Sequence, residues 1–230
     1  MKNLNKKQLG SLIKKDILIA KNKSGSLLAL YLIYFAIAFF SLREVKTLLT
    51  LSQGNFKTLF AVLFLFQTSF IIAFILFPQF IYKESMKEKH EIYFAYQFNI
   101  LEIVIAKSLI LTSLGLLPGY LLLLVLFYSL LEFSAPFIFC IFLIIPLISF
   151  VIIAFNVLFS WFTKSGRIIS TGFLLIFIFL FTQIRKIIKP SVNITFGYIN
   201  LVLLGITIIL MTGIILISLA ISKERCILKN

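Results

Sequence analysis

The residues best able to do chemistry are concentrated in residues 82–107, which read YKESMKEKHEIYFAYQFNILEIVIAK. The stretch contains the only histidine, His90, and eight charged side chains: Lys83, Glu84, Lys87, Glu88, Lys89, Glu91, Glu102 and Lys107. Acids and bases at this density could act in catalysis or dock another protein. The middle of the stretch, Tyr93–Leu101, carries no charge and is rich in aromatic residues. Such an apolar segment must be buried against the rest of the chain, a membrane surface or a partner protein.

The common catalytic and cofactor-binding motifs are absent from the sequence. There is no G-x-x-x-x-G-K-[ST] phosphate-binding loop, so the sequence predicts no ATP binding of that kind by this chain. H-E-x-x-H is missing, and two cysteines with one histidine match no metal-site spacing. The single histidine lies in a loop, where it cannot complete a Ser-His-Asp set. We therefore predict that the chain is no enzyme by itself and binds no cofactor or metal; a membrane enzyme is the least favoured alternative.

The composition is that of a membrane protein. Hydrophobic residues make up 61% of the 230 residues, charged residues only 13%, and the mean hydropathy is +1.10. A soluble fold of this size exposes too much surface to hide so many apolar side chains. A spanning helix needs about 20 mostly apolar residues. The chain offers six such runs: Leu27–Leu42, Leu59–Ile81, Ser108–Leu131, Pro136–Phe162, Ile168–Gln183 and Tyr198–Ser222.

These runs are continuous rather than alternating, which favours helices over a transmembrane barrel. The sequence therefore predicts an all-α polytopic membrane protein with six transmembrane helices, forming a single domain over residues 1–230. The net charge of +14 is then better explained by topology than by nucleic-acid binding, because cytoplasmic loops are enriched in Lys and Arg. Sixteen of the 22 Lys and Arg residues fall on one side, which predicts that both termini and residues 82–107 are cytoplasmic.

Residues 1–25 are predicted to form an amphipathic helix in the membrane interface. Their apolar residues fall on one helical face, with lysines elsewhere: Leu9, Leu12, Ile13, Ile17 and Ala20. That pattern is typical of a helix lying at the headgroup level. A polybasic anchor that only fixes topology is the alternative interpretation.

None of the six predicted spans contains Asp, Glu, Lys, Arg or His. Proton-driven transporters usually hold an ionisable group inside the membrane, so this absence argues against that class. The spans do contain Gln67 and Asn156. Such residues either line a transport pathway or, more often, form hydrogen bonds between helices.

The end of the 82–107 stretch resembles a motif of a known family. Glu102-Ile103-Val104-Ile105-Ala106-Lys107 is similar to the E-I-V-x-G-K ending found in the type-2 permease family of ATP-binding-cassette (ABC) transporters, with Ala106 in place of the glycine. Lys87, Glu88 and Lys89 stand where that family has a charged segment. Glu91 to Asn99 stand where it has a cytoplasmic coupling helix between the second and third spans.

The resemblance implies the permease subunit of an ATP-driven exporter in a bacterial cell membrane. Two permease subunits, identical or homologous, would enclose a pathway for an amphiphilic substrate such as a peptide, a lipid or a drug-like molecule. Two separate ATPase subunits would bind ATP and Mg²⁺. They would dock on the coupling segment through Lys87, Glu88, Glu91, Tyr93, Phe94, Tyr96, Phe98, Glu102 and Lys107. The alternative function is a small membrane protein that works without a motor, such as a bacteriocin immunity or sensor protein.

Overall fold

The computed structural model describes residues 6–36, 56–77, 80–81, 99–127, 134–162, 172 and 196–220. Within these ranges the chain is almost entirely helical, which confirms the prediction of an all-α protein. Three helices are long and apolar enough to cross a membrane, which gives the chain the character of a membrane-embedded protein: Ile100–Val125, Ala135–Ser160 and Asn200–Ser218. All but residue 172 of the predicted span Ile168–Gln183 lies outside the described residues.

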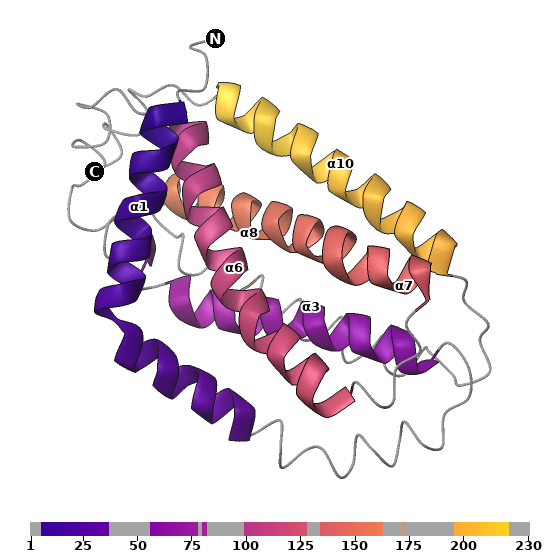
Figure 1. Cartoon of the computed structure of the whole chain (residues 1–230). Coiled ribbons are helices and arrows are strands. Elements are labelled where there is room, and N and C mark those ends of the chain that lie inside the picture. The colour runs from indigo at the N-terminus through magenta and orange to yellow at the C-terminus, as the bar shows by residue number, and fades with distance from the viewer. Residues whose placement is uncertain are drawn as a thin grey trace.

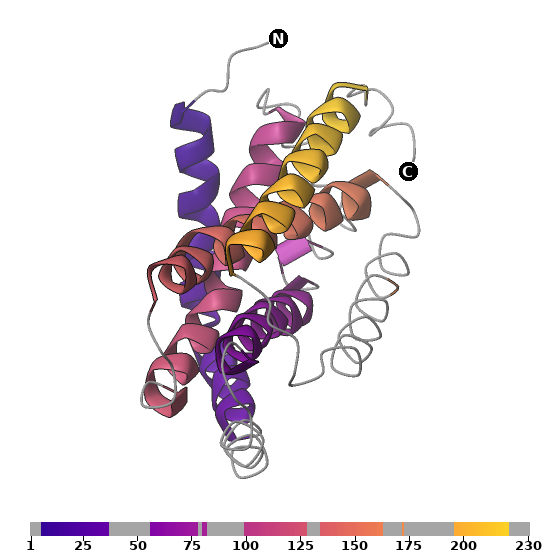
Figure 2. The same cartoon turned by 90° about the vertical axis from the view of Figure 1, so that its right-hand side faces the viewer.

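The described helices are, in chain order, α1 (Lys6–Asn22), the helix Ser24–Ala36, α3 (Phe56–Phe77), α6 (Ile100–Phe127), α7 (Ala135–Phe139), the π-helical turn η3 (Cys140–Ile144), α8 (Ile145–Phe162) and α10 (Phe196–Ala220). Helix α6 crosses α3 and α8, and α10 packs along α8 (Figure 1). Helix α1 lies across the end of the bundle at which α6 begins, and the chain then turns at Lys23. Figure 2 shows α1 at one edge of the molecule, with α6 between it and α10.

Apolar side chains of α3, α6 and α8 form the core in two clusters. The cluster at the end of the bundle covered by α1 includes Phe77, Leu111 and Val157. The cluster at the opposite end includes Leu65 of α3 and Ile144 of the turn before α8. The outer surface is also apolar, and helix α10 in particular is exposed over most of its length. A helix bundle that is apolar both inside and outside is suited to lipid rather than to water.

Two glycines let α6 approach α3 closely. A β-carbon at Gly115 would lie 2.5 Å from the backbone oxygen of Ser69, and one at Gly119 would lie 2.9 Å from Cδ1 of Leu65. The two positions have the G-x-x-x-G spacing that brings helix backbones together in membranes, where dispersion contacts between helices replace the hydrophobic effect. The glycines therefore fix where along their lengths α3 and α6 meet.

The helix Ser24–Ala36 is tied to α6 through a backbone oxygen that a proline leaves without its helical donor. Pro118 lies inside α6 and has no N–H to donate to the oxygen of Leu114, four residues earlier. The Tyr31 hydroxyl donates to that oxygen at 2.8 Å. Because a backbone oxygen in apolar surroundings needs a donor, Tyr31 supplies the missing bond and also joins the two helices.

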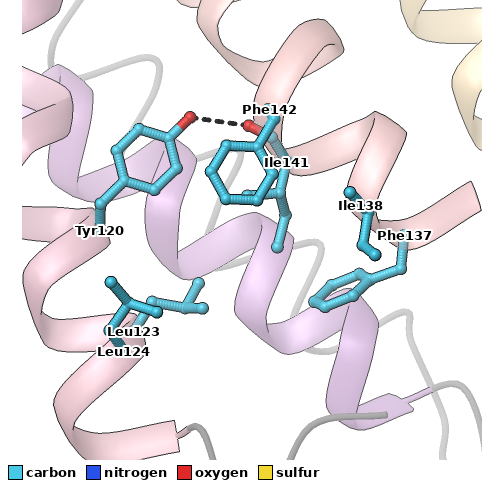
Figure 3. A pocket seen from close by; sticks show the side chains of 7 residues that line it. All are labelled: Tyr120, Leu123, Leu124, Phe137, Ile138, Ile141 and Phe142. Carbon is cyan, nitrogen blue, oxygen red and sulfur yellow. Dashed lines mark hydrogen bonds between the residues drawn. The ribbon is translucent and has the colours of Figure 1, made fainter. Parts of the chain in front are cut away.

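A second tyrosine has the same role at η3. The N–H of Ile145 donates to the oxygen of Cys140, five residues earlier, rather than to that of Ile141. The next residue, Pro146, has no N–H, so neither the α nor the π register supplies a donor to the Ile141 oxygen. The Tyr120 hydroxyl donates to this oxygen at 2.8 Å (Figure 3). This bond fastens α6 to the turn that leads into α8.

The close contact at Gly115 predicts a position-specific cost of adding a single methyl group. Gly115→Ala forces the new β-carbon against rigid backbone of α3, so we expect it to lower the free energy of unfolding by about 1–3 kcal/mol. In the matched control, Gly205→Ala, the new β-carbon meets nothing within 4 Å. Denaturant titration in detergent micelles measures both. Equal effects of the two substitutions would contradict the close α3–α6 contact.

The role of Tyr31 predicts an interaction between two substitutions. Tyr31→Phe removes the donor to the Leu114 oxygen, and leaving that buried acceptor unpaired should cost about 1–3 kcal/mol of stability. In a Pro118→Ala background, residue 118 regains an N–H that can donate to the same oxygen. We therefore expect Tyr31→Phe to cost clearly less there, which a double-mutant cycle of unfolding free energies measures. An equal cost in both backgrounds would show that the hydroxyl does not replace the missing donor.

Candidate functional site at the start of α6

Helix α6 begins at Ile100, earlier than the predicted start of the third span at Ser108. The last part of the predicted segment 82–107 is therefore the first part of the same helix. The cause is local. The N–H of Ile103 donates to the oxygen of Asn99 at 3.2 Å, and Oε2 of Glu102 accepts the N–H of Asn99 at 3.0 Å. A glutamate reaching back to the N–H of the residue before the helix is one half of a capping box, and it sets the helix start at Asn99.

Glu102 is thus engaged within the chain. Its side chain is buried, with the residue only 2% exposed. A carboxylate at the N-terminus of a helix is also stabilised by the positive end of the helix dipole. Glu102, proposed from the resemblance as a docking residue, lies here as a buried capping group.

Lys107 is likewise turned inward. Its Nζ donates to Oδ1 of Asp16 in α1 at 2.9 Å, and the two residues are 2% and 1% exposed. Asp16 is the only aspartate of the chain and the only acidic residue among residues 1–25. The ion pair therefore joins the N-terminal helix to the first turns of α6, across a wide separation in sequence.

The face of α1 that carries Asp16 packs on α6. Leu12, one turn before Asp16, forms a small buried cluster with Ile103 and Ala106 of α6. Ile17, which the sequence analysis placed on the apolar face, is instead 52% exposed. Helix α1 is amphipathic as predicted, but its buried face includes Asp16 and excludes Ile17. Asp16 is buried because its carboxylate pairs with Lys107 inside the protein.

Burial makes this ion pair costly to disrupt. Removing one partner of a buried pair leaves an uncompensated charge in a medium of low dielectric constant. Salt screens such a pair far less than it screens a pair on the surface. The candidate spanning helix Ile100–Val125 contains two ionisable side chains, Glu102 and Lys107, both of which precede the predicted span Ser108–Leu131. Both belong to its first two turns, at the end of the bundle covered by α1.

The other predicted docking residues lie outside the described part of the chain, namely Lys87, Glu88, Glu91, Tyr93, Phe94, Tyr96 and Phe98. The described helix begins two residues after the last of them.

The two residues predicted as pathway-lining differ in burial. Gln67 in α3 is half-buried, whereas Asn156 in α8 is 3% exposed. The Oδ1 atom of Asn156 has no hydrogen-bond partner among the described residues. In the described ranges no group of three His, Cys, Asp or Glu side chains could hold a metal ion.

Three further buried side chains carry hydroxyl groups. Ser69, Thr112 and Ser149 are buried, and their hydroxyls have no partner within the described helices. Each lies between the stretches of its own helix that contribute to the two apolar clusters of the core. They therefore mark a polar level near the middle of the bundle.

No family model matches the chain, and neither a curated protein nor a solved structure matches it.

The buried ion pair predicts that substitutions at Asp16 and Lys107 have strongly non-additive effects on the unfolding free energy. Lys107→Met should lower the unfolding free energy by about 3–5 kcal/mol, because it removes the buried cation that Asp16 contacts. The double variant Asp16→Leu/Lys107→Met removes both charges and should recover most of that loss. Denaturant titration in detergent measures all three chains.

A matched control is Lys14→Met in the same helix, since Lys14 is exposed and its loss should change stability by no more than about 0.5 kcal/mol. A buried ion pair would be contradicted if the changes in unfolding free energy were additive and each substitution cost as little as Lys14→Met.

Proposed function

We propose that the chain is the permease subunit of an ATP-driven exporter of the type-2 ABC family, with six spans and both termini in the bacterial cytoplasm. Two such subunits, identical or homologous, would enclose the pathway, and two separate ATPases would supply the power. The observation that carries this proposal is that α6 begins directly after the predicted aromatic docking segment in the sequence. Seven of the nine predicted docking residues precede α6, the last of them Phe98, and α6 runs without a break from Ile100 to Phe127.

Continuity matters because a motor can act on a permease only through an element stiff enough to carry displacement. An uninterrupted α-helix of 28 residues is such an element, and at about 1.5 Å per residue it is long enough to cross the membrane. In the proposed mechanism, closure of the ATPases pushes on the segment 82–98, and α6 moves as a lever.

The contacts at the start of α6 extend the moving unit to α1. The ion pair between Lys107 and Asp16, together with the packing of Leu12 against Ile103, means that α1 follows any displacement of α6. The apolar interior and the apolar outer surface support an amphiphilic substrate that enters from the bilayer, such as a peptide or a lipid. In this account Glu102 and Lys107 transmit movement inside the permease, and the ATPase contacts are left to residues 87–98.

The proposal predicts a stable complex with a P-loop ATPase from the same cell. The purified chain alone should bind no ATP, whereas the complex should hydrolyse it. Tyr93→Asp and Tyr96→Asp each place a charge on the predicted aromatic docking surface, and should lower recovery of the ATPase by about tenfold or more, because a desolvated charge in such an interface costs several kcal/mol.

The matched control is Asn22→Asp, which adds one negative charge at an exposed position of α1. Co-purification from native membranes, with circular dichroism as a check of folding, measures all three variants. ATPase recovery that survives both tyrosine substitutions would overturn the docking role. Full function of the isolated chain in vesicles without any ATPase would favour the motor-independent alternative.

A further inference from the structure

A small apolar cavity lies between the second half of α6 and the segment formed by α7 and η3. Its volume is about 60 Å³, and it is lined by Tyr120, Leu123, Leu124, Phe137, Ile138, Ile141 and Phe142 (Figure 3). The lining surface is wholly apolar, because the Tyr120 hydroxyl, the one side-chain polar atom of the set, is turned onto the Ile141 oxygen. The cavity lies toward the end of the bundle opposite α1.

The walls of the cavity are held in place before anything binds. The Tyr120 ring stacks on the Phe142 ring, with 5.6 Å between ring centroids and an interplanar angle of 5°. Its hydroxyl is fixed by the bond to Ile141, an oxygen that the π-helical turn and Pro146 leave without a backbone donor. The irregular turn therefore positions one wall of the cavity, and ligand binding requires no reordering of that wall.

The cavity opens onto the outer surface of the bundle. Leu123 and Phe137 are buried and form its floor, whereas Leu124, Ile138 and Phe142 are exposed. The surface around these exposed residues is also apolar, and both helices that carry it are long and apolar enough to cross a membrane. A mouth with such surroundings is suited to the hydrocarbon of a bilayer rather than to water.

We propose that this cavity binds part of the acyl chain of a membrane lipid. Water is a poor occupant because the lining offers it no hydrogen-bond partners, and apolar cavities of this kind stay dry but accept apolar guests. The volume suits a few methylene groups of one chain. Because lipid is already apolar, the hydrophobic effect does not drive this binding. The favourable free energy comes from dispersion contacts between the acyl chain and cavity walls that would otherwise face a void. These contacts favour one chain held in the cavity over exchange with bulk lipid.

The test places a fluorescent reporter at the mouth of the cavity. The only tryptophan, Trp161, is replaced by Phe, and Phe142→Trp then introduces one reporter in the full chain. The matched reporter is Leu143→Trp, whose position is half-exposed and adjacent in sequence but does not line the cavity. Each protein is reconstituted in phosphatidylcholine vesicles that contain an increasing fraction of lipid brominated midway along one acyl chain.

Bromine quenches tryptophan only at close range. We expect quenching at position 142 to saturate at a low fraction of brominated lipid and to exceed that at position 143 by about twofold, because a chain held in contact with the walls stays beside the reporter. Ile138→Phe and Leu124→Phe, two substitutions at exposed lining positions, fill the mouth and should each reduce quenching at position 142 to the level at position 143.

Equal quenching at both reporters would overturn the proposal, since the cavity would then hold lipid no better than the rest of the surface. So would quenching at position 142 that neither filling variant lowers. Weaker quenching at position 142 than at 143 would mean that water or a second copy of the chain covers the cavity, and would also overturn it. Circular dichroism and thermal unfolding of each variant confirm that it has folded.

Discussion

The buried ion pair between Lys107 and Asp16 is the contact on which the arrangement of this chain depends. Two opposite charges can lie inside apolar surroundings only when they meet each other, so the position of α1 and that of α6 are set together. The pair also decides which face of α1 packs inward and which carries exposed lysines. Helix α1, which the sequence predicts to lie in the membrane interface, packs on α6 at the end where the proposed motor would act.

The same constraint, that polar groups in apolar surroundings need partners within the chain, explains the other irregular features. Glu102 satisfies the N–H of Asn99 at the start of α6. Tyr31 and Tyr120 satisfy oxygens that lack a backbone donor, near Pro118 and Pro146 respectively. The two tyrosine bonds also join segments that the helical pattern alone would not connect. Polar side chains therefore do little for solubility here and much for the geometry of the bundle.

The sequence predicts the helical class of the protein and most of its apolar segments, because continuous hydrophobic runs leave few alternatives. It does not predict the partner of Lys107, since Asp16 is far away in sequence and lies within a lysine-rich segment. A single acidic residue among so many lysines, on an apolar face, was an available signal. The G-x-x-x-G spacing of Gly115 and Gly119 was another. The start of α6 and the acyl-chain cavity depend on capping and on packing between helices, which hydrophobic periodicity does not reveal.

Hydrogen exchange of the intact chain in lipid nanodiscs tests most directly whether the ion pair holds α1 onto the bundle. If it does, backbone amides of α1 around Asp16 exchange about as slowly as those of α6, and the substitution Lys107→Met makes the α1 amides exchange much faster while those of α10 keep their rates. Fast exchange of α1 in the unsubstituted chain, or protection of α1 that Lys107→Met leaves unchanged, would contradict the account.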